Sequence, residues 1–273
     1  MNAFDLMKIT GFGAASVPSS CFVTAKSSVR FAVRAPGGNS LHIDWDNGDS
    51  EDIEMTGDNI TVTKDYGSGG NRTIRFSGNG NTALNYLECY GNLITSLDVS
   101  KNTALTELYC GSNSLTALDV SKNTALNKLS CSYNSLSTLN VTSNIALHYL
   151  HCGWNSLPEL DVSANRVLNR LHCNDNLLTA LDISHCPVYY LSCGHNPLTA
   201  LPLTNLAHVT NLFCAGCNLN SAAINSILYT LAIQEEFLGH LTCNGQIPAA
   251  PPTGQGVADK STIFYRAWSI ITD

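Results

Sequence analysis

Seven cysteines recur at a nearly constant interval through the middle of the chain. They are Cys89, Cys110, Cys131, Cys152, Cys173, Cys193 and Cys214, and the successive steps are 21, 21, 21, 21, 20 and 21 residues. Each cysteine stands in the same phrase, L-x-x-L-x-C-x-x-N-x-L, as in the run from Leu105 to Leu115. A fixed period of this length is typical of one short structural unit stacked on itself. This part of the chain is therefore predicted to fold as a solenoid.

The full unit, L-x-x-L-x-C-x-x-N-x-L-T-x-L-D-V-S-x-N-T-A, predicts the path of each coil. L-x-x-L-x-C is expected to form a short strand with Leu and Cys inward and the intervening residues outward. The asparagines after the strand are expected to be buried, because their amides can bond backbone groups at the turn. This column comprises Asn92, Asn113, Asn134, Asn155, Asn176 and Asn196. The L-D-V-S segment should return in extended form with modest curvature, because the unit is too short for a proper helix.

These repeats resemble the leucine-rich repeat family, particularly its short bacterial forms, across roughly half of the chain. The resemblance implies a solenoid with one sheet of parallel strands, and a protein that recognises other proteins. The cysteine column occupies a position where this repeat type normally carries Leu. We expect free, packed thiols there, because a buried Cys behaves as a small hydrophobe. Four cysteines lie outside the column, and a disulfide between two of them stays open: Cys21, Cys186, Cys217 and Cys243.

The first 80 residues contain no repeat and are predicted to form a small β-sandwich. Short runs of alternating or β-branched residues lie at 28–33, 40–45, 60–63 and 72–76, separated by turns rich in Gly and Asn. Leu41–Asp49, which contains W-D-N-G-D, and the later run Val62–Tyr66 resemble the PKD-like domain family. This resemblance implies an Ig/PKD-like fold in which Trp45 and Tyr66 are core aromatics rather than ligand contacts.

The repeat pattern weakens toward the C-terminus, where a helical cap is predicted. His185–Val188 is one residue shorter than the segment it replaces, and Cys217 stands in the asparagine position of the last unit. Apolar residues on one face predict a helix over 222–233, which would cover the open edge of the last coil. The expected fold class is thus mainly β with a short helix. The expected parts are a PKD-like β-sandwich over 1–80, a leucine-rich repeat solenoid of about seven coils over 81–220 and a C-terminal cap over 221–273.

Charge and hydropathy exclude two classes of partner. The formal net charge is −7, whereas a nucleic-acid-binding protein needs a basic face. No apolar stretch approaches the ~20 residues that span a bilayer. The start of the chain shows no export signal. We therefore expect no nucleic acid and no membrane span, and leave the location open between an intracellular or virion-borne protein and an exported one whose signal has been removed.

No pattern in the sequence indicates a catalytic residue, a cofactor or a bound metal. G-x-S-x-G, H-E-x-x-H and the phosphate-binding G-x-x-x-x-G-K-S/T do not occur. His151 and His172 occupy equivalent positions in adjacent coils, a spacing that suits a metal or a pH-sensitive patch. The favoured interpretation is surface histidines, because Ser130 and Ser192 beside them are poor metal ligands. Two sets of acids are interpreted as turn residues, with calcium as the alternative: Asp98, Asp119, Asp161 and Asp182, and the cluster Asp44, Asp46 and Asp49.

The outward positions of the predicted strands carry most of the aromatic and charged side chains of the repeats. The candidate binding surface comprises Tyr86, Tyr90, Glu107, Tyr109, Tyr149, His151, Trp154, Arg170, His172, Tyr190 and Phe213. Exposed Tyr, Trp and Arg are enriched at binding hot spots. Aromatic residues on open sheets also pair for stability. The sequence favours a non-catalytic protein that binds a protein or glycan partner through this face.

One other function stays open, and a second is not expected. The end of the chain, from Ala222–Ala232 through 251–256 to 260–272, resembles C-terminal segments of repeat proteins in bacterial prophage and tail-associated genes, which implies a structural or virion component. Leu198–Pro202 resembles the repeats of bacterial effector ligases. The roughly 60 residues that follow the repeats are too few for the catalytic domain of such a ligase, so an enzyme is not expected.

Overall fold

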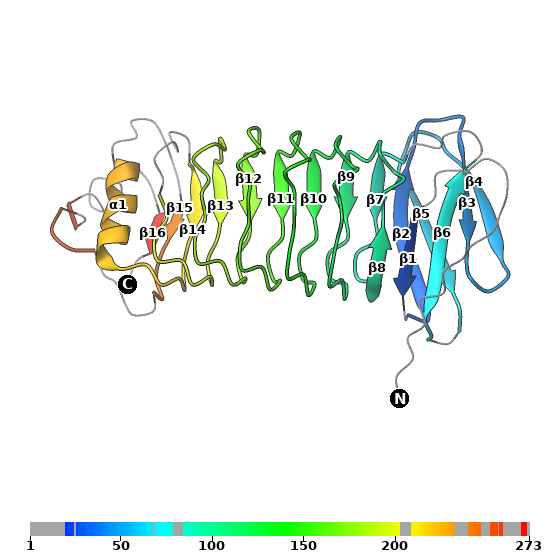
Figure 1. Ribbon diagram of the computed structural model, residues 1–273, viewed down its shortest axis with the longest axis horizontal. Helices are drawn as coiled ribbons and strands as arrows, with labels where there is room; N and C mark the ends of the chain where they lie inside the picture. Colours follow the sequence, from blue (N-terminus) through cyan, green and yellow to red (C-terminus); the bar gives the residue numbers. More distant parts are fainter. Residues whose placement is uncertain are drawn as a thin grey trace.

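The L-x-x-L-x-C phrase forms one three-residue parallel strand in each coil. The central Leu of each strand is fully buried, and its two neighbours lie on the outer face of the sheet. These strands are β7 (Tyr86–Glu88), β9 (Glu107–Tyr109), β10 (Lys128–Ser130), β11 (Tyr149–His151), β12 (Arg170–His172), β13 (Tyr190–Ser192), β14 (Asn211–Phe213) and β15 (His240–Thr242). Every residue pairs with its equivalent in the next coil. In the computed structural model the strands therefore stack in an almost straight row (Figure 1).

The structure describes most of the chain, including residues 84–202 of the repeats without a gap. The described residues are 20–24, 26–67, 69–78, 84–202, 209–232, 240–246, 252–255, 257–258 and 269–271, with the side chains of 20–23, 78 and 269–271 excepted. Of the two C-terminal segments that resemble prophage and tail-associated proteins, 251–256 is described at 252–255 and 260–272 only at 269–271.

Two sheets run through the N-terminal part and continue into the solenoid. The further strands are β1 (Ser20–Thr24), β2 (Ser28–Arg34), β3 (Ser40–Asp44), β4 (Ser50–Glu54), β5 (Ile60–Asp65), β6 (Arg72–Gly78), β8 (Ile94–Asp98) and β16 (Ser269–Ile271). One sheet has the order β4-β3-β6-β1-β8. The other is the solenoid sheet, which β5 and β2 extend beyond β7 and which β16 ends beyond β15. Because β8 belongs to the return side of the first coil, both sides of the solenoid are joined to the N-terminal strands.

Aromatic side chains hold the two N-terminal sheets together. The ring of Phe31 on β2 lies 5.8 Å from that of Trp45 and 5.0 Å from that of Phe76 on β6. Trp45 is 1% exposed. Tyr66 is partly buried, and its hydroxyl donates to the Trp45 carbonyl at 3.1 Å. Both aromatics thus lie in or beside the core, while the PKD-like classification of this part stays a prediction.

A ladder of asparagine side chains joins each coil to the one before it. Asn176 shows the pattern: its Nδ2 donates to the carbonyls of Cys152 and Cys173, and its Oδ1 accepts the Leu157 N–H. Asn92, the first member, makes the same kind of bonds to the backbone of Arg30 on β2. The expected column therefore exists and reaches the N-terminal sheet, although Asn113, Asn134 and Asn155 are only partly buried.

A second asparagine ladder lies on the return side and was not predicted. Its members come from the S-x-N-T-A part of the unit and are Asn102, Asn123, Asn144 and Asn165. Asn144 Nδ2 donates to the carbonyls of Val120 and Asn123 in the preceding coil, at 3.0 and 2.8 Å. The amide is completely buried. Backbone carbonyls that the short return segment leaves without strand partners are thus satisfied by side chains.

The cysteine column is the apolar spine of the solenoid. The ten cysteines whose side chains are described are all buried and free. Cys243, expected outside the column, is its eighth member, because it follows β15 as Cys214 follows β14. Cys217 takes an asparagine position in the first ladder, and Cys186 takes one in the second. The Cys186 Sγ lies 3.4 Å from the Val162 carbonyl, and the Cys217 Sγ lies 3.5 Å from the Cys193 carbonyl. An asparagine amide bonds the equivalent carbonyls elsewhere in the ladders.

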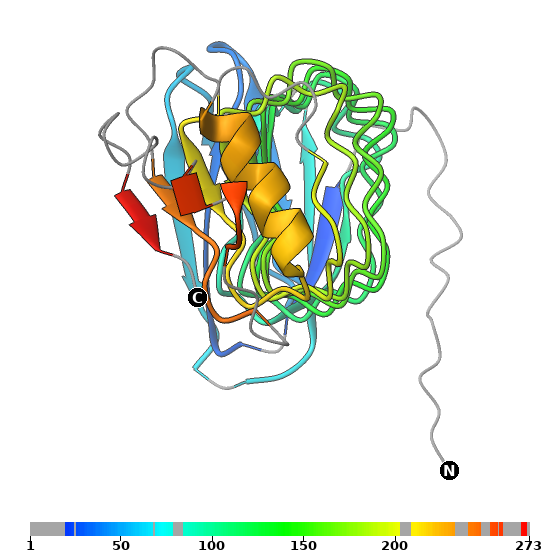
Figure 2. The same ribbon diagram turned by 90° about the vertical axis from the view of Figure 1, so that its left-hand side faces the viewer.

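The helix α1 (Ser221–Ala232) follows the last regular repeat. It begins one residue before the predicted range of 222–233, whose last residue is not described. Asn220 caps its N-terminus by accepting the Ala223 N–H at 2.9 Å. The end-on view of Figure 2 shows α1 lying across the end of the solenoid, between the sheet and the return segments. Among the described residues, no helix has the length and apolarity required to cross a bilayer.

Candidate binding face

The outer face of the solenoid sheet carries two columns of side chains, one from each outward position of the strands. The first column is Tyr86, Glu107, Lys128, Tyr149, Arg170, Tyr190, Asn211 and His240. The second column is Glu88, Tyr109, Ser130, His151, His172, Ser192, Phe213 and Thr242. Paired strands lie about 4.8 Å apart, so neighbouring members of a column can touch. We call this surface the strand face.

Six rings on the C-terminal half of the strand face form a connected group, the ring series: Tyr149, His151, His172, Tyr190, Phe213 and His240. His172 lies at its centre, with ring centroids 5.6 Å from Tyr149, 5.0 Å from His151 and 4.6 Å from Tyr190. The series continues from Tyr190 to Phe213 at 5.4 Å and from Phe213 to His240 at 5.1 Å. Because the rings pack against one another, each is partly buried and holds a defined position.

Burial within the ring series favours the neutral forms of His151 and His172. Burial lowers the pKa of His151. Burial, together with the charges of His151 and Arg170, lowers the pKa of His172 to about 4. These two imidazoles are therefore uncharged aromatic groups at neutral pH. This state differs from the charged patch that two adjacent histidines would form.

The N-terminal end of the strand face combines tyrosines with carboxylates. The Tyr86 hydroxyl donates to Glu88 at 2.5 Å, and the Tyr109 hydroxyl donates to Glu107 at 2.9 Å. Burial opposes ionisation of Glu107, but the Tyr109 hydrogen bond and the charges of Lys128 and Arg34 lower its pKa overall.

Tyr86 is the exception within the predicted surface. It was expected to be exposed, yet only 8% of it is accessible. The Arg34 guanidinium at the end of β2 lies over its ring, 5.1 Å from the centroid. The N-terminal sheet covers this position, and nothing in the repeat pattern indicates that contact.

An exposed aromatic stack borders the strand face. Tyr133 and Trp154 are stacked with centroids 4.3 Å apart and planes 8° from parallel, and they are 45% and 39% exposed. The His151 ring meets Trp154 edge-on at 6.3 Å, so the stack adjoins the ring series. Both stacked residues have a positive φ of 53°, a left-handed conformation that bulky residues rarely adopt. The turn before each asparagine imposes this conformation and projects both rings outward.

The other predicted residues have different surroundings. Tyr90 is 56% exposed and lies against Gly111, where an added Cβ would approach its ring to 3.2 Å. Arg170 turns toward Tyr189, with its guanidinium 5.2 Å from that ring. His240 joins the ring series although the sequence did not single it out. The run from His240 to Cys243 matches the end of the strand phrase, and this match could have placed His240 on the strand face.

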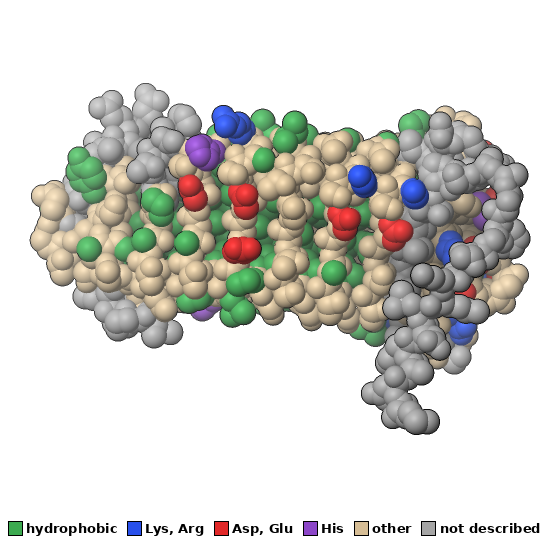
Figure 3. Space-filling model, viewed as in Figure 1, with side chains coloured by type: hydrophobic (Ala, Val, Ile, Leu, Met, Phe, Trp, Pro, Cys, Tyr) green, Lys and Arg blue, Asp and Glu red, His purple; other side chains and the backbone are tan. Residues whose placement is uncertain are grey.

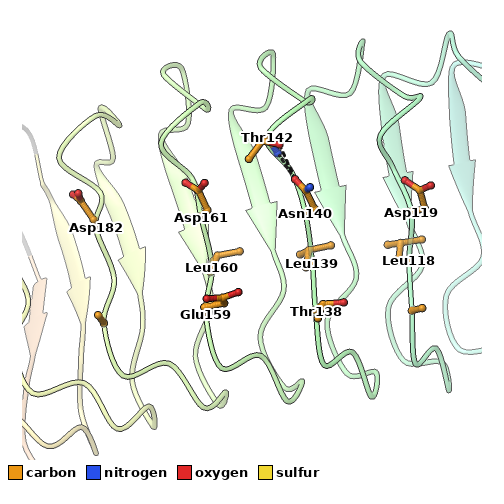
Figure 4. A pocket seen from close by; sticks show the side chains of 12 residues that line it. Leu118, Asp119, Thr138, Leu139, Asn140, Thr142, Glu159, Leu160, Asp161 and Asp182 are labelled. Atoms are coloured by element: carbon orange, nitrogen blue, oxygen red, sulfur yellow. Dashed lines mark hydrogen bonds between the residues drawn. The ribbon is translucent and has the colours of Figure 1, made fainter.

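The opposite side of the solenoid, formed by the return segments, carries a shallow acidic groove of about 770 Å³. Figure 3 shows acidic side chains in a row across the coils on this side, and Figure 4 shows Asp119, Asn140, Asp161 and Asp182 at equivalent positions. Each of these side chains accepts the backbone N–H of the Ser or Thr two residues later. Hydrogen bonds from Ser121, Ser163 and Ser184 lower the pKa of the three aspartates. The row is therefore built of turn residues.

Positive side chains of the chain itself neutralise the N-terminal acidic cluster. Lys64 Nζ lies 2.9 Å from Asp49, and Arg75 lies 3.5 Å from Asp44 and 3.6 Å from Asp46. In the described part of the chain, no three His, Cys, Asp or Glu side chains are grouped as metal ligands would be. The structure thus offers hydrogen-bonding and charge partners for these acids within the fold.

Solved leucine-rich repeat structures share this arrangement of coils. A leucine-rich repeat protein of Leptospira interrogans matches with a TM-score of 0.53 and 19% identity, over 64% of this chain and 44% of that chain. The leucine-rich effector YopM of Yersinia pestis matches with a TM-score of 0.50 and 20% identity, over 69% of this chain and 49% of that chain. The functional domain of InlJ from Listeria monocytogenes, which includes a cysteine ladder, is 29% identical over 66% of this chain and 47% of that chain, with a TM-score of 0.47.

The first two likenesses show the fold, which is a mainly β solenoid of parallel strands as in bacterial leucine-rich repeat proteins. This chain spans about half of the length of each of these three structures. No family model matches the sequence, and no curated protein is similar to it.

Proposed function

We propose that this chain is a non-catalytic interaction protein that binds a protein partner through its strand face. The ring series carries the proposal, because it presents six packed rings in fixed positions on one open face. Rigid aromatic side chains contribute binding energy with little loss of conformational entropy. Arg170 and the Tyr133–Trp154 stack at the border add the residue types that are enriched in protein interfaces.

The orientation of the rings favours a protein partner over a glycan. Successive rings pack against one another along the solenoid, with centroids 4.6 to 5.6 Å apart. Their faces are therefore partly covered by their neighbours. A sugar stacks on an open ring face, whereas backbone and side-chain groups of a protein can bond the hydroxyl and imidazole edges.

The thiols support a non-catalytic function. Burial raises the pKa of Cys89 and Cys131 to about 12 and also raises the pKa of Cys110 and Cys152. A nucleophilic cysteine needs an accessible thiolate, which these positions disfavour.

The test is a capture experiment with variants directed at one face. Tyr149→Ala, Tyr190→Ala and Phe213→Ala in one chain should reduce capture of partner proteins from an extract by at least about tenfold, because a central aromatic contact typically contributes 2 kcal/mol or more. The matched control carries three substitutions on the return side, Thr138→Ala, Glu159→Ala and Asp161→Ala, and should capture the same partners as the wild type.

Circular dichroism and the melting temperature establish that both variants remain folded. Equal loss of capture in both variants, or undiminished capture by the strand-face variant, would contradict the proposal.

A further inference from the structure

We propose that the N-terminal end of the strand face holds a pocket for an arginine side chain of the protein partner. The pocket has a volume of about 450 Å³ and is lined by Tyr86, Glu88, Tyr90, Glu107, Tyr109 and Ser130. We call it the Tyr–Glu pocket. The proposal assigns a chemical group of the partner to one region of the strand face, and so it rests on the proposed function.

The lining combines the two groups that bind a guanidinium ion. Tyrosine ring faces attract cations, and a carboxylate forms paired hydrogen bonds with the planar fork of Arg. Tyr86 and Tyr109 lie 5.6 Å apart with their planes tilted by 49°, and Tyr90 is the most exposed aromatic residue of the wall. Three rings and two carboxylates therefore converge on one cavity of side-chain size.

The chain already binds one guanidinium with the same residues. Arg34 from β2 lies over the Tyr86 ring at 5.1 Å, and its Nη2 lies 3.5 Å from Glu107. This internal contact occupies the side of the cluster that faces the N-terminal sheet. The open side presents the remaining tyrosines and the second carboxylate in the same combination. The solvent-facing side of the pocket thus offers a tyrosine and carboxylate combination like the one that holds Arg34.

One carboxylate of the pocket has no positive partner among the described residues. Glu107 is neutralised by Arg34 at 3.5 Å and by Lys128 at 3.4 Å. Glu88 accepts the Tyr86 hydroxyl, and none of the described Lys or Arg side chains forms an ion pair with it. Glu88 is also exposed, so an entering cation can reach it without displacing an internal partner.

Arginine is preferred to other cations for geometric reasons. Its planar guanidinium can lie against Tyr90 or Tyr109 while its N–H groups point to Glu88. A lysine ammonium is a compact and strongly hydrated charge that stacks poorly on rings. A quaternary ammonium would contact the rings but has no N–H to donate to a carboxylate.

The test uses short peptides with the full-length protein at low salt. Ligand-observed NMR compares acetyl-Gly-Arg-Gly-amide with the same peptide containing citrulline, which has nearly the same shape but no charge, and with choline. The arginine peptide should bind at least about fivefold more tightly than either. Equal binding of the arginine and citrulline peptides, or tighter binding of choline, would overturn the proposal.

Variants locate the binding. Glu88→Gln and Tyr90→Ala should each weaken binding of the arginine peptide about fivefold. Lys128→Gln should strengthen it, because removal of the ammonium frees Glu107. There are two matched controls. Tyr229→Ala removes an equally exposed tyrosine on α1 at the far end of the solenoid, and Glu159→Gln removes a carboxylate on the return side. Neither variant should change binding of the arginine peptide. Unchanged binding by the Glu88 and Tyr90 variants would place the peptide elsewhere and refute the pocket.

The peptide assay separates this proposal from the proposed function. If the ring-series variant loses its partners but the arginine peptide does not bind, the strand face stands and the pocket fails. If the peptide binds as described but the ring-series variant captures partners normally, the pocket stands and the ring series is not the interface.

Discussion

At the residue scale, His172 shows how the repeat controls the chemistry of a surface side chain. It lies on an outward position of β12, yet contacts with three other rings remove much of its hydration. Its pKa falls from 6.5 to about 4 because burial disfavours the charged imidazole. An exposed position in a strand pattern therefore does not imply an ordinary, freely titrating histidine.

This shift predicts a loss of stability in acid. The unfolded chain binds a proton at His172 once the pH falls below 6.5, whereas the folded chain does not until about 4. The stabilisation by the neutral ring is complete above pH 6.5 and is lost as the pH falls toward 4. When the pH falls from about 7.5 to 4.5, the unfolding free energy of the wild type should decrease by roughly 1–2 kcal/mol more than that of His172→Gln. This range allows for solvent screening, because His172 is partly exposed.

Urea denaturation at the two pH values measures this difference. His185→Gln serves as the control, because His185 is an exposed residue of a return-side turn, and it should follow the wild type. A wild type and a His172→Gln variant with parallel pH dependence would show that the ring series does not hold His172 neutral.

A second residue-scale prediction concerns Cys217, which replaces asparagine in the first ladder. Its thiol is a weak partner for the Cys193 carbonyl at 3.5 Å. An amide at this position can donate to that carbonyl and also accept a backbone N–H of the preceding coil, as Asn196 does. Cys217→Asn should therefore raise the unfolding free energy by about 1 kcal/mol in urea denaturation. Cys217→Ser is the control for thiol removal, and equal stability of the two variants would contradict the expected role of the amide.

At the scale of the structural elements, the coils depend on asparagine side chains as much as on the sheet. Strands of three residues leave many backbone groups without strand partners, and the two ladders bond these groups. This arrangement accounts for the strict spacing of Asn in a unit that otherwise tolerates substitution on its surface.

The ladder predicts a large cost for one truncation. In Asn176→Ala, the Leu157 N–H and the carbonyls of Cys152 and Cys173 lose a buried partner. The unfolding free energy should fall by about 2–4 kcal/mol, because an unsatisfied buried group costs roughly 1–3 kcal/mol. Asn140→Ala, an exposed turn residue of the return side, should cost less than about 1 kcal/mol. Similar costs for the two variants would refute a structural role for the ladder.

The elements also show what the sequence can predict. The Cys and Asn columns were predictable, because their interval directly indicates a stacked coil. The second ladder was missed, since its asparagines stand in a return segment whose residues also suit an ordinary turn. A final strand remnant was expected over 241–244, where β15 lies, but the place of Cys243 in the column and of His240 on the strand face was missed because α1 interrupts the period. The prediction that Tyr86 is exposed was wrong, because the side chain of Arg34, which is distant in the sequence, covers the Tyr86 ring.

The approach of the His151 and His172 rings was expected from their equivalent positions, but the other contacts between rings were not predicted, for a different reason. The repeat predicts which side chains share a face, and it correctly placed Tyr149, His172 and Tyr190 together on the strand face. Which rings touch depends on side-chain rotamers and on diagonal neighbours, as in the contact of His172 with Tyr149 across two columns. Spacing alone contains no information about these choices.

At the scale of the whole molecule, a stack of coils should open from its ends. Each coil contacts only its neighbours, so stability is approximately a sum of local terms. The cysteine column reports on this, because burial protects every described thiol. Under native conditions, alkylation followed by peptide mass spectrometry should label Cys243 at the C-terminal end at least about tenfold faster than Cys152 in the centre. Equal labelling rates at both positions would indicate a single cooperative opening of the entire chain.

The two faces of the molecule provide the most direct test of the proposed binding mode. A photoreactive amino acid is placed at Ser192 on the strand face in one chain and at Ser163 on the return side in another, since neither serine is fully buried. We predict that a partner protein cross-links to the strand-face position and not to the return-side position, and that the Tyr149, Tyr190 and Phe213 triple variant abolishes the product. Cross-linking from Ser163 alone, or a product that persists in the triple variant, would contradict binding through the strand face.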